Sequence, residues 1–315
     1  MGGGDDPSLC NRDRIILFKE LIEDYYDDLL FRGSRNYTNS YNKIKNHILP
    51  VFGSININNI TNVQIQQFKM KKLKEGYAPS TVETLIGSMS AIFVFSAKIS
   101  MKFKGNNPAY KVASDLTRVE NFRLRYLNSE EIELLIYSYR NYKTPEISQA
   151  IILFIKLSLS TAARASTVIN IKRRDIDLNT RQVRLYDFKN QSHYVGYLSK
   201  TLFQDLDFLK DMEPDYKVLY TTQALIYPTL LYHMRPVYDE LFNEGLKKHD
   251  RYRFSIHSIR HTVASNLAIQ GVSLLKIKHI LNHKSIRSTL IYAKLQNKDT
   301  FDDLDALYSK KDGSL

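Results

Sequence analysis

Hydrophobic residues recur at three- and four-residue intervals along the first hundred positions, which is the spacing of helices that bury one face. The second of these helices is expected to stop at Pro50, because proline cannot continue a helix. The third and fourth are expected to open with reciprocal side-chain caps at Thr61-x-x-Gln64 and Ser80-x-x-Glu83. The pattern predicts a bundle of four helices at residues 14–30, 37–49, 63–74 and 81–100.

The second half of the chain mixes helical spacing with strict alternation. Another cap, Asn128-x-x-Glu131, opens a helix, and residues 151–159 are nearly all apolar, as in a fully buried helix. Apolar and polar residues alternate over 181–188 and 193–198, which predicts a β-hairpin whose turn carries Lys189. Further helices are expected at residues 203–210, 230–244, 258–270 and 274–281. The predicted fold is therefore mainly α with a small β-sheet.

The chain of 315 residues is long enough for two domains, each with its own core. A polar stretch without periodicity follows the bundle and is interpreted as a linker. Near the end, Phe301, Leu304, Leu307 and Tyr308 fall at helical spacing among aspartates, which predicts an amphipathic tail helix. The expected organisation is a disordered lead at 1–12, a helical domain at 13–112, a linker at 113–124, an α+β domain at 125–296 and the tail at 297–315.

The charge balance favours a polyanionic partner. The chain carries 45 Lys and Arg against 33 Asp and Glu, a net charge of +12, and nucleic acid is the commonest polyanion. Twelve basic and two acidic residues lie between Arg32 and Lys111. A merely solvated basic surface is the alternative. The predicted DNA-contacting residues are Lys43, Lys45, Lys69, Lys71, Lys72 and Lys74 in the helical domain, and Lys172, Arg173, Arg251 and Arg253 in the second domain.

Cysteine content and hydropathy restrict the compartment. Cys10 is the single cysteine, so an internal disulfide and a cysteine-rich zinc site are excluded. No uninterrupted apolar run approaches the roughly 20 residues of a membrane span, and no apolar signal core opens the sequence. A reducing, cytoplasmic setting without a membrane partner is expected.

The stretch from His257 to Tyr292 holds the candidate chemistry. His257 and Arg260 share a helical face, and His283 precedes Tyr292 by nine residues. A phenol attacks phosphorus only where developing negative charge is neutralised, and the planar fork of arginine suits two phosphate oxygens. A second arginine is expected for the two non-bridging oxygens, and Arg164 in TAARAST follows the predicted buried helix. These residues together indicate a phosphodiester-cleaving site.

The order and spacing of these motifs resemble the tyrosine recombinase, or phage integrase, family over roughly residues 13–300. The resemblance implies that an α+β catalytic domain cuts and rejoins double-stranded DNA through a 3′-phosphotyrosine bond, with no cofactor, metal or ATP. The text HILPVFGSININNITNVQIQQF also resembles the helical, SAM-like core-binding domain of phage-type integrases. The family further implies a nucleoid-associated tetramer linked through C-terminal tails, and it allows for accessory proteins.

The resemblance assigns a role to each matching residue. Tyr292 would be the nucleophile, Lys189 would protonate the departing 5′ oxygen with Lys200 as its alternative, and the arginines would bind the phosphate. Family members usually carry an acid three positions after the first arginine, where this chain has Thr167, whose hydroxyl can still accept a hydrogen bond. The predicted catalytic residues are Arg164, Lys189, His257, Arg260, His283 and Tyr292.

Other interpretations are weighed beside this one. The pairs His257/His261 and His279/His283 have the spacing of metal ligands, but Ser258 stands where a metalloprotease motif needs glutamate. His261 and His279 are expected instead to pack or to support the site. A DNA-binding protein that does not cut, and a type IB topoisomerase, are further alternatives. Within recombination, integration or excision of a mobile element is preferred, with Xer-like resolution of chromosome dimers as the alternative.

Overall fold

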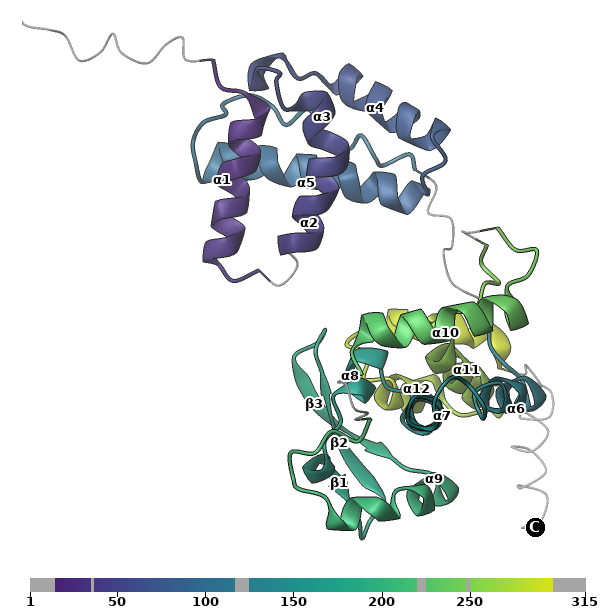
Figure 1. The fold of residues 1–315 in the computed structure, drawn as a ribbon. Coiled ribbons are helices and arrows are strands. Elements are labelled where there is room, and N and C mark those ends of the chain that lie inside the picture. The colour runs from purple at the N-terminus through teal and green to yellow at the C-terminus, as the bar shows by residue number, and fades with distance from the viewer. Residues whose placement is uncertain (1–14, 35–36, 117–124, 220–224, 248–249, 297–315) are drawn as a thin grey trace, which may run out of the picture. The chain divides into compact units, whose positions relative to one another are not determined.

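The computed structural model describes residues 15–34, 37–116, 125–219, 225–247 and 250–296 (Figure 1). The chain divides into two compact units, Met1–Asn121 and Phe122–Leu315. The predicted lead, the larger part of the predicted linker and the predicted tail helix lie outside the described residues. The first linker residues, 113–116, continue directly from Val112, which is buried in the core of the first unit.

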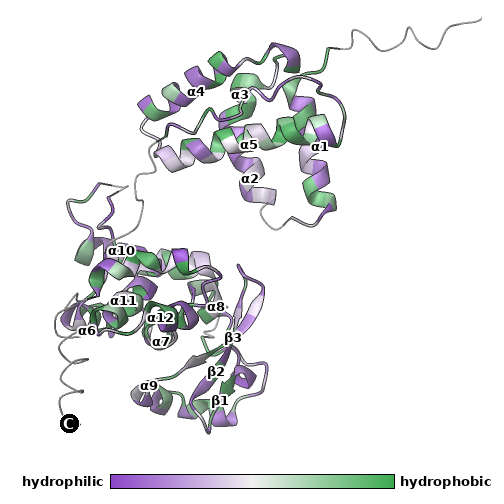
Figure 2. Ribbon diagram, turned by 180° about the vertical axis from the view of Figure 1, so that it is seen from behind, coloured by the Kyte–Doolittle hydropathy of each residue, from purple (hydrophilic) through white to green (hydrophobic). Residues whose placement is uncertain are grey.

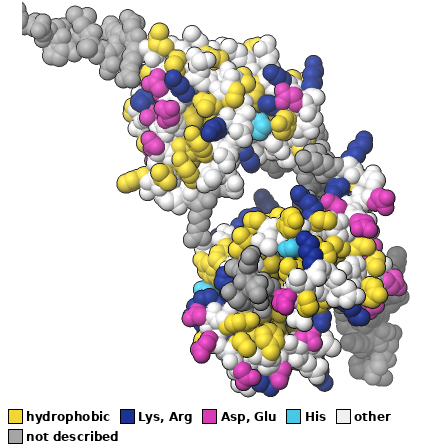
Figure 3. All heavy atoms as spheres, viewed as in Figure 1, with side chains coloured by type: hydrophobic (Ala, Val, Ile, Leu, Met, Phe, Trp, Pro, Cys, Tyr) yellow, Lys and Arg dark blue, Asp and Glu magenta, His cyan; other side chains and the backbone are white. Residues whose placement is uncertain are grey.

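The first unit is a small bundle of helices around one apolar core. Its central helix α5 is apolar and α4 is largely hydrophilic (Figure 2). On the face shown in Figure 3, acidic side chains gather over α1. The elements are α1 (Phe18–Phe31), α2 (Tyr37–Lys43), a π-helical turn (Ile44–Ile48), α3 (Leu49–Phe52), a 3-10 turn (Ile57–Asn59), α4 (Asn62–Lys74) and α5 (Pro79–Lys98).

Helix α5 has the length and hydropathy of a membrane-spanning helix. Its apolar residues nevertheless pack inside the first unit. Leu85, Met89, Ile92 and Phe93 are all buried, and the ring of Phe93 stacks on that of Phe18 in α1 at 5.1 Å between centroids. The hydrophobic character of α5 is therefore explained by its place at the centre of the bundle.

The helix starts show which local signals decide the fold. The cap predicted at Thr61 is confirmed, because the Thr61 N–H donates to Oε1 of Gln64 at 2.8 Å and the Gln64 N–H donates back to the hydroxyl oxygen at 3.3 Å. The cap predicted at Ser80 is wrong. Helix α5 begins at Pro79, since the fixed φ and missing N–H of proline suit the first helical position.

The prediction that the second helix stops at Pro50 is also wrong. The chain widens into the π-helical turn, where the N–H of Leu49 donates to the carbonyl of Ile44, five residues back. Helix α3 then starts afresh, and Pro50 falls in its first turn. A proline without an N–H is tolerated there, so the helical path continues to Phe52.

The second unit places helices around a three-stranded sheet of order β1-β2-β3 (Figure 1). The predicted hairpin is confirmed: β2 and β3 pair antiparallel from Gln182↔Tyr197 to Asp187↔Ser192. The elements are α6 (Ser129–Tyr137), α7 (Pro145–Thr161), α8 (Ala165–Ile169), β1 (Ile176–Asp177), β2 (Gln182–Asp187), β3 (Ser192–Tyr197), α9 (Lys200–Asp205), α10 (Tyr227–Phe242), α11 (Ile256–Ile269), α12 (Leu274–Ile280) and 3-10 helices at Ile286–Ser288 and Leu290–Leu295.

Helix α7 forms much of the core of this unit and leads to the candidate site. Ile151, Phe154 and Ile155 are fully buried, but Ile152 and Leu153 are only partly covered and line an open cavity. The prediction of a fully buried helix is therefore wrong for one of its faces. The helix contacts α11, which carries the second predicted arginine.

Candidate active site

Arg164 stands where α7 gives way to α8. Helix α7 ends at Thr161, and Ala162 follows in a left-handed conformation with φ of 51° that ends the helix and redirects the chain. Arg164 is then the N-cap residue of α8. Its guanidinium forms an ion pair with the buried carboxylate of Asp187, the last residue of β2. The arginine is thereby held where helix and sheet meet.

Arg260 on α11 is almost completely buried, with 3% of its surface exposed. Its Nη1 donates to the carbonyl of Ala162 at 2.8 Å, and its Nη2 donates to the carbonyl of Leu281. Burial, followed by the like charge of Arg164, lowers the pKa of Arg260 to about 10, so it remains a cation at neutral pH. The structure thus brings together the two arginines that the sequence separates by almost a hundred residues.

Tyr292 lies on the 3-10 helix Leu290–Leu295, with 4% of its surface exposed. Its hydroxyl is hydrogen-bonded to Nδ1 of His261, with 2.6 Å between the two atoms. Burial raises the pKa of the Tyr292 phenol to about 12, although the charge of Arg260 opposes the shift. A phenol with this pKa is neutral at pH 7, so nucleophilic attack requires a base that accepts its proton.

The expectation that His261 packs or supports the site is met in its second form, because His261 is the side chain that bonds the Tyr292 hydroxyl. One sequence signal could have found it. His261 follows His257 by four residues on α11 and therefore shares its face, and the two rings meet edge to face at 4.8 Å. His257 is exposed, and the ring of His261 lies between it and the phenol of Tyr292.

His283 follows α12, and its Nδ1 is hydrogen-bonded to the hydroxyl of Thr289 at 3.0 Å. Burial is the largest cause that lowers the pKa of His283, to about 4, and its imidazole is therefore neutral at pH 7. The neighbouring positive groups that lower this pKa further are Arg260, Arg164, His261 and Lys189. Four of the six predicted catalytic residues, His283, Arg260, Arg164 and Lys189, are therefore neighbours. Tyr292 joins them through its proximity to Arg260.

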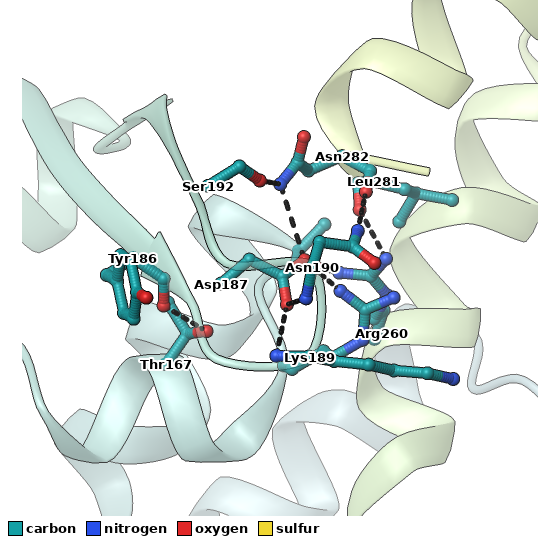
Figure 4. Close-up of polar contacts among 11 residues, drawn as sticks. Thr167, Tyr186, Asp187, Lys189, Asn190, Ser192, Arg260, Leu281 and Asn282 are labelled. Carbon is teal, nitrogen blue, oxygen red and sulfur yellow. Dashed lines mark hydrogen bonds and ion pairs between the residues drawn. The ribbon is translucent and has the colours of Figure 1, made fainter. Parts of the chain in front are cut away.

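Lys189 lies in the turn of the hairpin, as predicted, and is exposed. Its backbone N–H donates to Oδ1 of Asp187 at 3.0 Å, and its side chain extends away from that carboxylate (Figure 4). Lys200, the alternative, opens α9 beyond the other end of β3. The turn position therefore favours Lys189 as the lysine of the site.

Thr167 does not support Arg164 in the expected way. Its buried hydroxyl donates to the backbone carbonyl of Tyr186 at 2.9 Å, and the partner of Arg164 is Asp187 instead. Tyr194 on β3 is a further group that the sequence analysis missed. Burial raises the pKa of this phenol to about 12, and its hydroxyl contacts Arg260.

The arrangement does not favour the metal-ligand alternative. The described residues contain no group of three or more His, Cys, Asp or Glu side chains that could hold a metal ion. His279 is exposed on α12, and His261 is engaged with a phenol. Positive charge in this site comes instead from guanidinium groups.

Three of the side chains predicted to contact DNA already have protein partners, and one of the three, Lys69, is buried. Lys69 is buried on α4 and donates to the carbonyl of Val112 at 3.1 Å and to both carboxylate oxygens of Asp115 at 2.8 Å. Arg173 donates to the carbonyls of Leu209 and Ile176. Arg253 pairs with Asp239 and donates to the carbonyl of Leu246. The prediction is therefore wrong for the buried Lys69, whereas Arg173 and Arg253 are partly exposed and their contacts with DNA stay predictions.

The other predicted contacts are exposed or partly exposed. Lys72 pairs with Glu75 and Lys172 pairs with Asp215, in ion pairs that a phosphate could replace. The exposed residues of the set are Lys43, Lys45, Lys71, Lys74 and Arg251.

The depressed pKa of His283 predicts a pH-dependent stability. In the unfolded chain a histidine gains its proton near pH 6.5, whereas His283 in the folded chain does so near pH 4. The unfolded state therefore binds more protons between these values, and the free energy of unfolding falls as the pH is lowered through this window. We expect a loss of about 1 to 2 kcal/mol between pH 7 and pH 5 from this group alone.

Denaturant unfolding at pH 7, 6 and 5 measures this loss. His283→Gln should unfold with a flatter pH dependence than the unsubstituted protein, while His279→Gln, at an exposed position on the neighbouring helix, should leave the dependence unchanged. An identical pH dependence in all three proteins would show that His283 is not held neutral by the fold.

Comparisons with known proteins agree with this fold. The family model described as the phage integrase family matches residues 125–299, and the model described as the phage integrase N-terminal SAM-like domain matches residues 17–73. A two-domain fold with paired arginines and a buried tyrosine defines the class, that of the tyrosine recombinases. The chain belongs to the phage integrase family.

Individual relatives are distant. A tyrosine recombinase of Pseudothermotoga lettingae is 23% identical over 260 residues, which cover 80% of this chain and 84% of the relative. One from Thermosipho africanus is 23% identical over 296 residues, covering 90% and 96%. A similar fold is found in the Tn1549 transposon integrase bound to transposon right end DNA, with a TM-score of 0.68, 17% identity and coverage of 94% and 99%.

Proposed function

We propose that the protein is a site-specific DNA recombinase that cleaves and rejoins strands through a 3′-phosphotyrosine intermediate. The observation that carries this proposal is the convergence of Arg164 and Arg260 near a buried phenol, in a chain that belongs to the phage integrase family. Two guanidiniums suit the two non-bridging oxygens of one phosphodiester. Their positive charge supplies the electrostatic stabilisation that phosphoryl transfer requires.

In the proposed cleavage step, the phenolic oxygen of Tyr292 attacks phosphorus while the bond to the 5′ oxygen breaks. His261 accepts the phenolic proton, because it already bonds the hydroxyl. Lys189 gives a proton to the departing 5′ oxygen from the exposed turn of the hairpin. His283, neutral and bonded to Thr289, is placed to donate a hydrogen bond to the phosphate from its other ring nitrogen.

Rejoining reverses this step. The phosphotyrosine bond conserves the energy of the phosphodiester, so a 5′ hydroxyl from another strand can displace Tyr292 without ATP. His257, whose ring contacts that of His261, is placed to influence the proton that His261 carries. The six residues predicted from sequence, with His261 added, account for both directions of the reaction.

Integration or excision of a mobile element is the biological role that we propose. The N-terminal match to the SAM-like domain of phage integrases supports this role. Xer-like resolution stays the second candidate, because a tyrosine recombinase XerC of Staphylococcus epidermidis is 25% identical over 185 residues, 57% of this chain and 60% of the relative. Sequencing the DNA that the protein binds in cells distinguishes the two roles. A mobile-element integrase should bind the ends of an element that flank its own gene, whereas an Xer-like resolvase should bind a chromosomal site elsewhere.

Assembly on DNA is proposed as well. Lambda integrase has been solved as a dimer bound to a core site, with a TM-score of 0.68 and 17% identity to this chain over 90% of it and 98% of that chain. We propose that this protein also assembles on double-stranded DNA, as a tetramer, and that the predicted tail at 297–315 joins neighbouring protomers.

A suicide duplex tests the cleavage activity. A nick next to the cleavage position releases a short fragment after attack, so the covalent intermediate accumulates. The duplex carries the site that the protein itself enriches from random DNA. A covalent adduct that survives denaturing electrophoresis in the presence of EDTA is the expected result. Tight binding without an adduct would favour the alternative of a DNA-binding protein that does not cut.

The two classes of lysine on α4 predict opposite effects. Lys69→Met should lower the free energy of unfolding of the first unit by about 1 to 3 kcal/mol, because the carbonyl of Val112 loses its donor, and leave DNA affinity unchanged. Its exposed neighbour Lys71, as Lys71→Met, should leave stability unchanged and reduce the slope of log affinity against log salt by about one. Urea unfolding and salt titrations measure both. The reverse pattern would return Lys69 to the DNA-contacting set.

A further inference from the structure

Asp187 carries an unusual number of interactions for one side chain. It is the last residue of β2, and 1% of its surface is exposed. One carboxylate oxygen, Oδ2, pairs with Nη1 of Arg164. The other, Oδ1, accepts the backbone N–H groups of Lys189 at 3.0 Å and Asn190 at 3.1 Å. A single buried carboxylate thus holds both Arg164 and the turn that carries Lys189, whose bond to Asp187 is drawn in Figure 4.

The same carboxylate reaches the loop that carries His283. Nδ2 of Asn282 donates to Oδ2 of Asp187 at 3.3 Å and to the hydroxyl of Ser192 at 3.1 Å. Nδ2 of Asn190 donates in return to the carbonyl of Asn282 at 2.8 Å. Asn282 has a left-handed φ of 47° and directly precedes His283. The hairpin turn and the end of α12 are therefore tied together around Asp187.

The backbone next to Asp187 is fixed from α8. The hydroxyl of Thr167, one turn after Arg164, donates to the carbonyl of Tyr186. This bond, drawn in Figure 4, anchors the end of β2 against α8. The carboxylate of the next residue, Asp187, pairs with the guanidinium of Arg164. Thr167 therefore supports the site by holding β2 in place, and the negative charge beside Arg164 comes from Asp187 on that strand.

We infer that Asp187 is a positioning residue that sets Arg164 and the Lys189 turn in one common geometry. Asp187 provides, from β2, the carboxylate that the family usually carries at the position of Thr167 on α8. Because one carboxylate bonds both Arg164 and the Lys189 turn, a displacement of either one shifts the other. Phosphate binding by Arg164 is thereby coupled to protonation of the leaving group by Lys189. The inference rests on the proposed recombinase function and assigns a residue to its machinery.

Two substitutions separate the two halves of this role. Asp187→Asn keeps the shape and an oxygen acceptor for the turn amides, but it removes the charge opposite Arg164. Asp187→Ala removes both. Asp177→Asn is the matched control, because Asp177 caps the β1–β2 turn by accepting the Asn179 N–H at 2.8 Å and is exposed.

Adduct formation is followed on two suicide duplexes, one with an ordinary phosphodiester and one with a 5′-bridging phosphorothiolate at the cleavage position. A departing sulfur needs no proton, so the second duplex does not depend on Lys189. We expect Asp187→Asn to be slowed about 30-fold or more on both duplexes. We expect Asp187→Ala to lose roughly a further tenfold on the ordinary duplex only. Asp177→Asn should react like the unsubstituted protein.

A rescue variant identifies the charge as the cause. Thr167→Asp combined with Asp187→Asn returns a carboxylate beside Arg164 from α8, and it should recover at least tenfold of the rate on both duplexes. Rates for Asp187→Asn equal to those of the unsubstituted protein would overturn the inference. Thr167→Asp alone is the control for the lost bond to the Tyr186 carbonyl, and a double variant no faster than Asp187→Asn would also overturn the inference where this single variant reacts at the unsubstituted rate. Asp187→Asn and its rescue decide the matter even where Asp187→Ala does not fold.

The outcome for the proposed function is read separately. An unsubstituted protein that forms no adduct with either duplex would refute the recombinase function itself. An unsubstituted protein that reacts, alongside Asp187 variants that react equally fast, would refute only the role of Asp187.

Discussion

Replacing Tyr292 by phenylalanine is expected to abolish the covalent protein–DNA adduct completely. The substitution removes only the hydroxyl oxygen that would form the bond to phosphorus. The ring is buried in a cluster with Ala264, Ala268 and Ile277, and phenylalanine fills the same space. Folding and DNA affinity should therefore persist, so that the loss reports on chemistry alone.

Denaturing electrophoresis of the protein with labelled suicide duplex measures this loss, and gel-shift titration checks that binding is retained. Tyr137→Phe is the matched control, because this tyrosine is exposed on α6 and should form adduct at the unsubstituted rate. An adduct formed by the Tyr292→Phe protein would assign the nucleophile to another residue.

Replacing Arg260 by lysine is expected to lower the rate of adduct formation by about two to three orders of magnitude. The guanidinium holds the carbonyls of Ala162 and Leu281 with two different nitrogens and still has donors left for a phosphate. A lysine ammonium is a compact point charge and cannot span these positions. The charge is retained, but the geometry is lost.

Single-turnover kinetics on the suicide duplex measures this effect. Arg140→Lys, at an exposed arginine that lies over the ring of Tyr137, is the matched control and should react normally. A rate within threefold of the unsubstituted protein would show that Arg260 acts as a structural cation and does not bind the scissile phosphate. Thermal unfolding of both variants checks that the fold is intact.

The fold was predictable where local chemistry decides it. Thr61 and Asn128 open helices because their caps involve residues three positions away, and the hairpin around Lys189 follows from alternation. The failures occurred where local signals compete. Pro50 lies in the first turn of α3, which starts afresh after a π-helical turn, and Pro79 begins helix α5 one residue before Ser80.

The site was predictable in residue type and order but only partly in contacts. Lys69 lies four residues after Ile65 and so on the buried face of α4, a signal that its basic neighbours obscured. Its partner Asp115 lies 46 residues away, which no local pattern reveals. Asp187 shares the inward face of β2 with Val183 and Leu185, and an inward carboxylate in a strand is itself a sign of a buried partner.

The main chain at the left-handed residue Ala162 determines how far apart the two guanidinium groups lie. The carbonyl of Ala162 accepts a hydrogen bond from Arg260, and Arg164 follows Ala162 by two residues. The distance between Arg260 and Arg164 therefore depends on the two residues of main chain from Ala162 to Arg164. A single inserted residue would carry Arg164 out of register and dismantle the phosphate cradle while every functional group remained present.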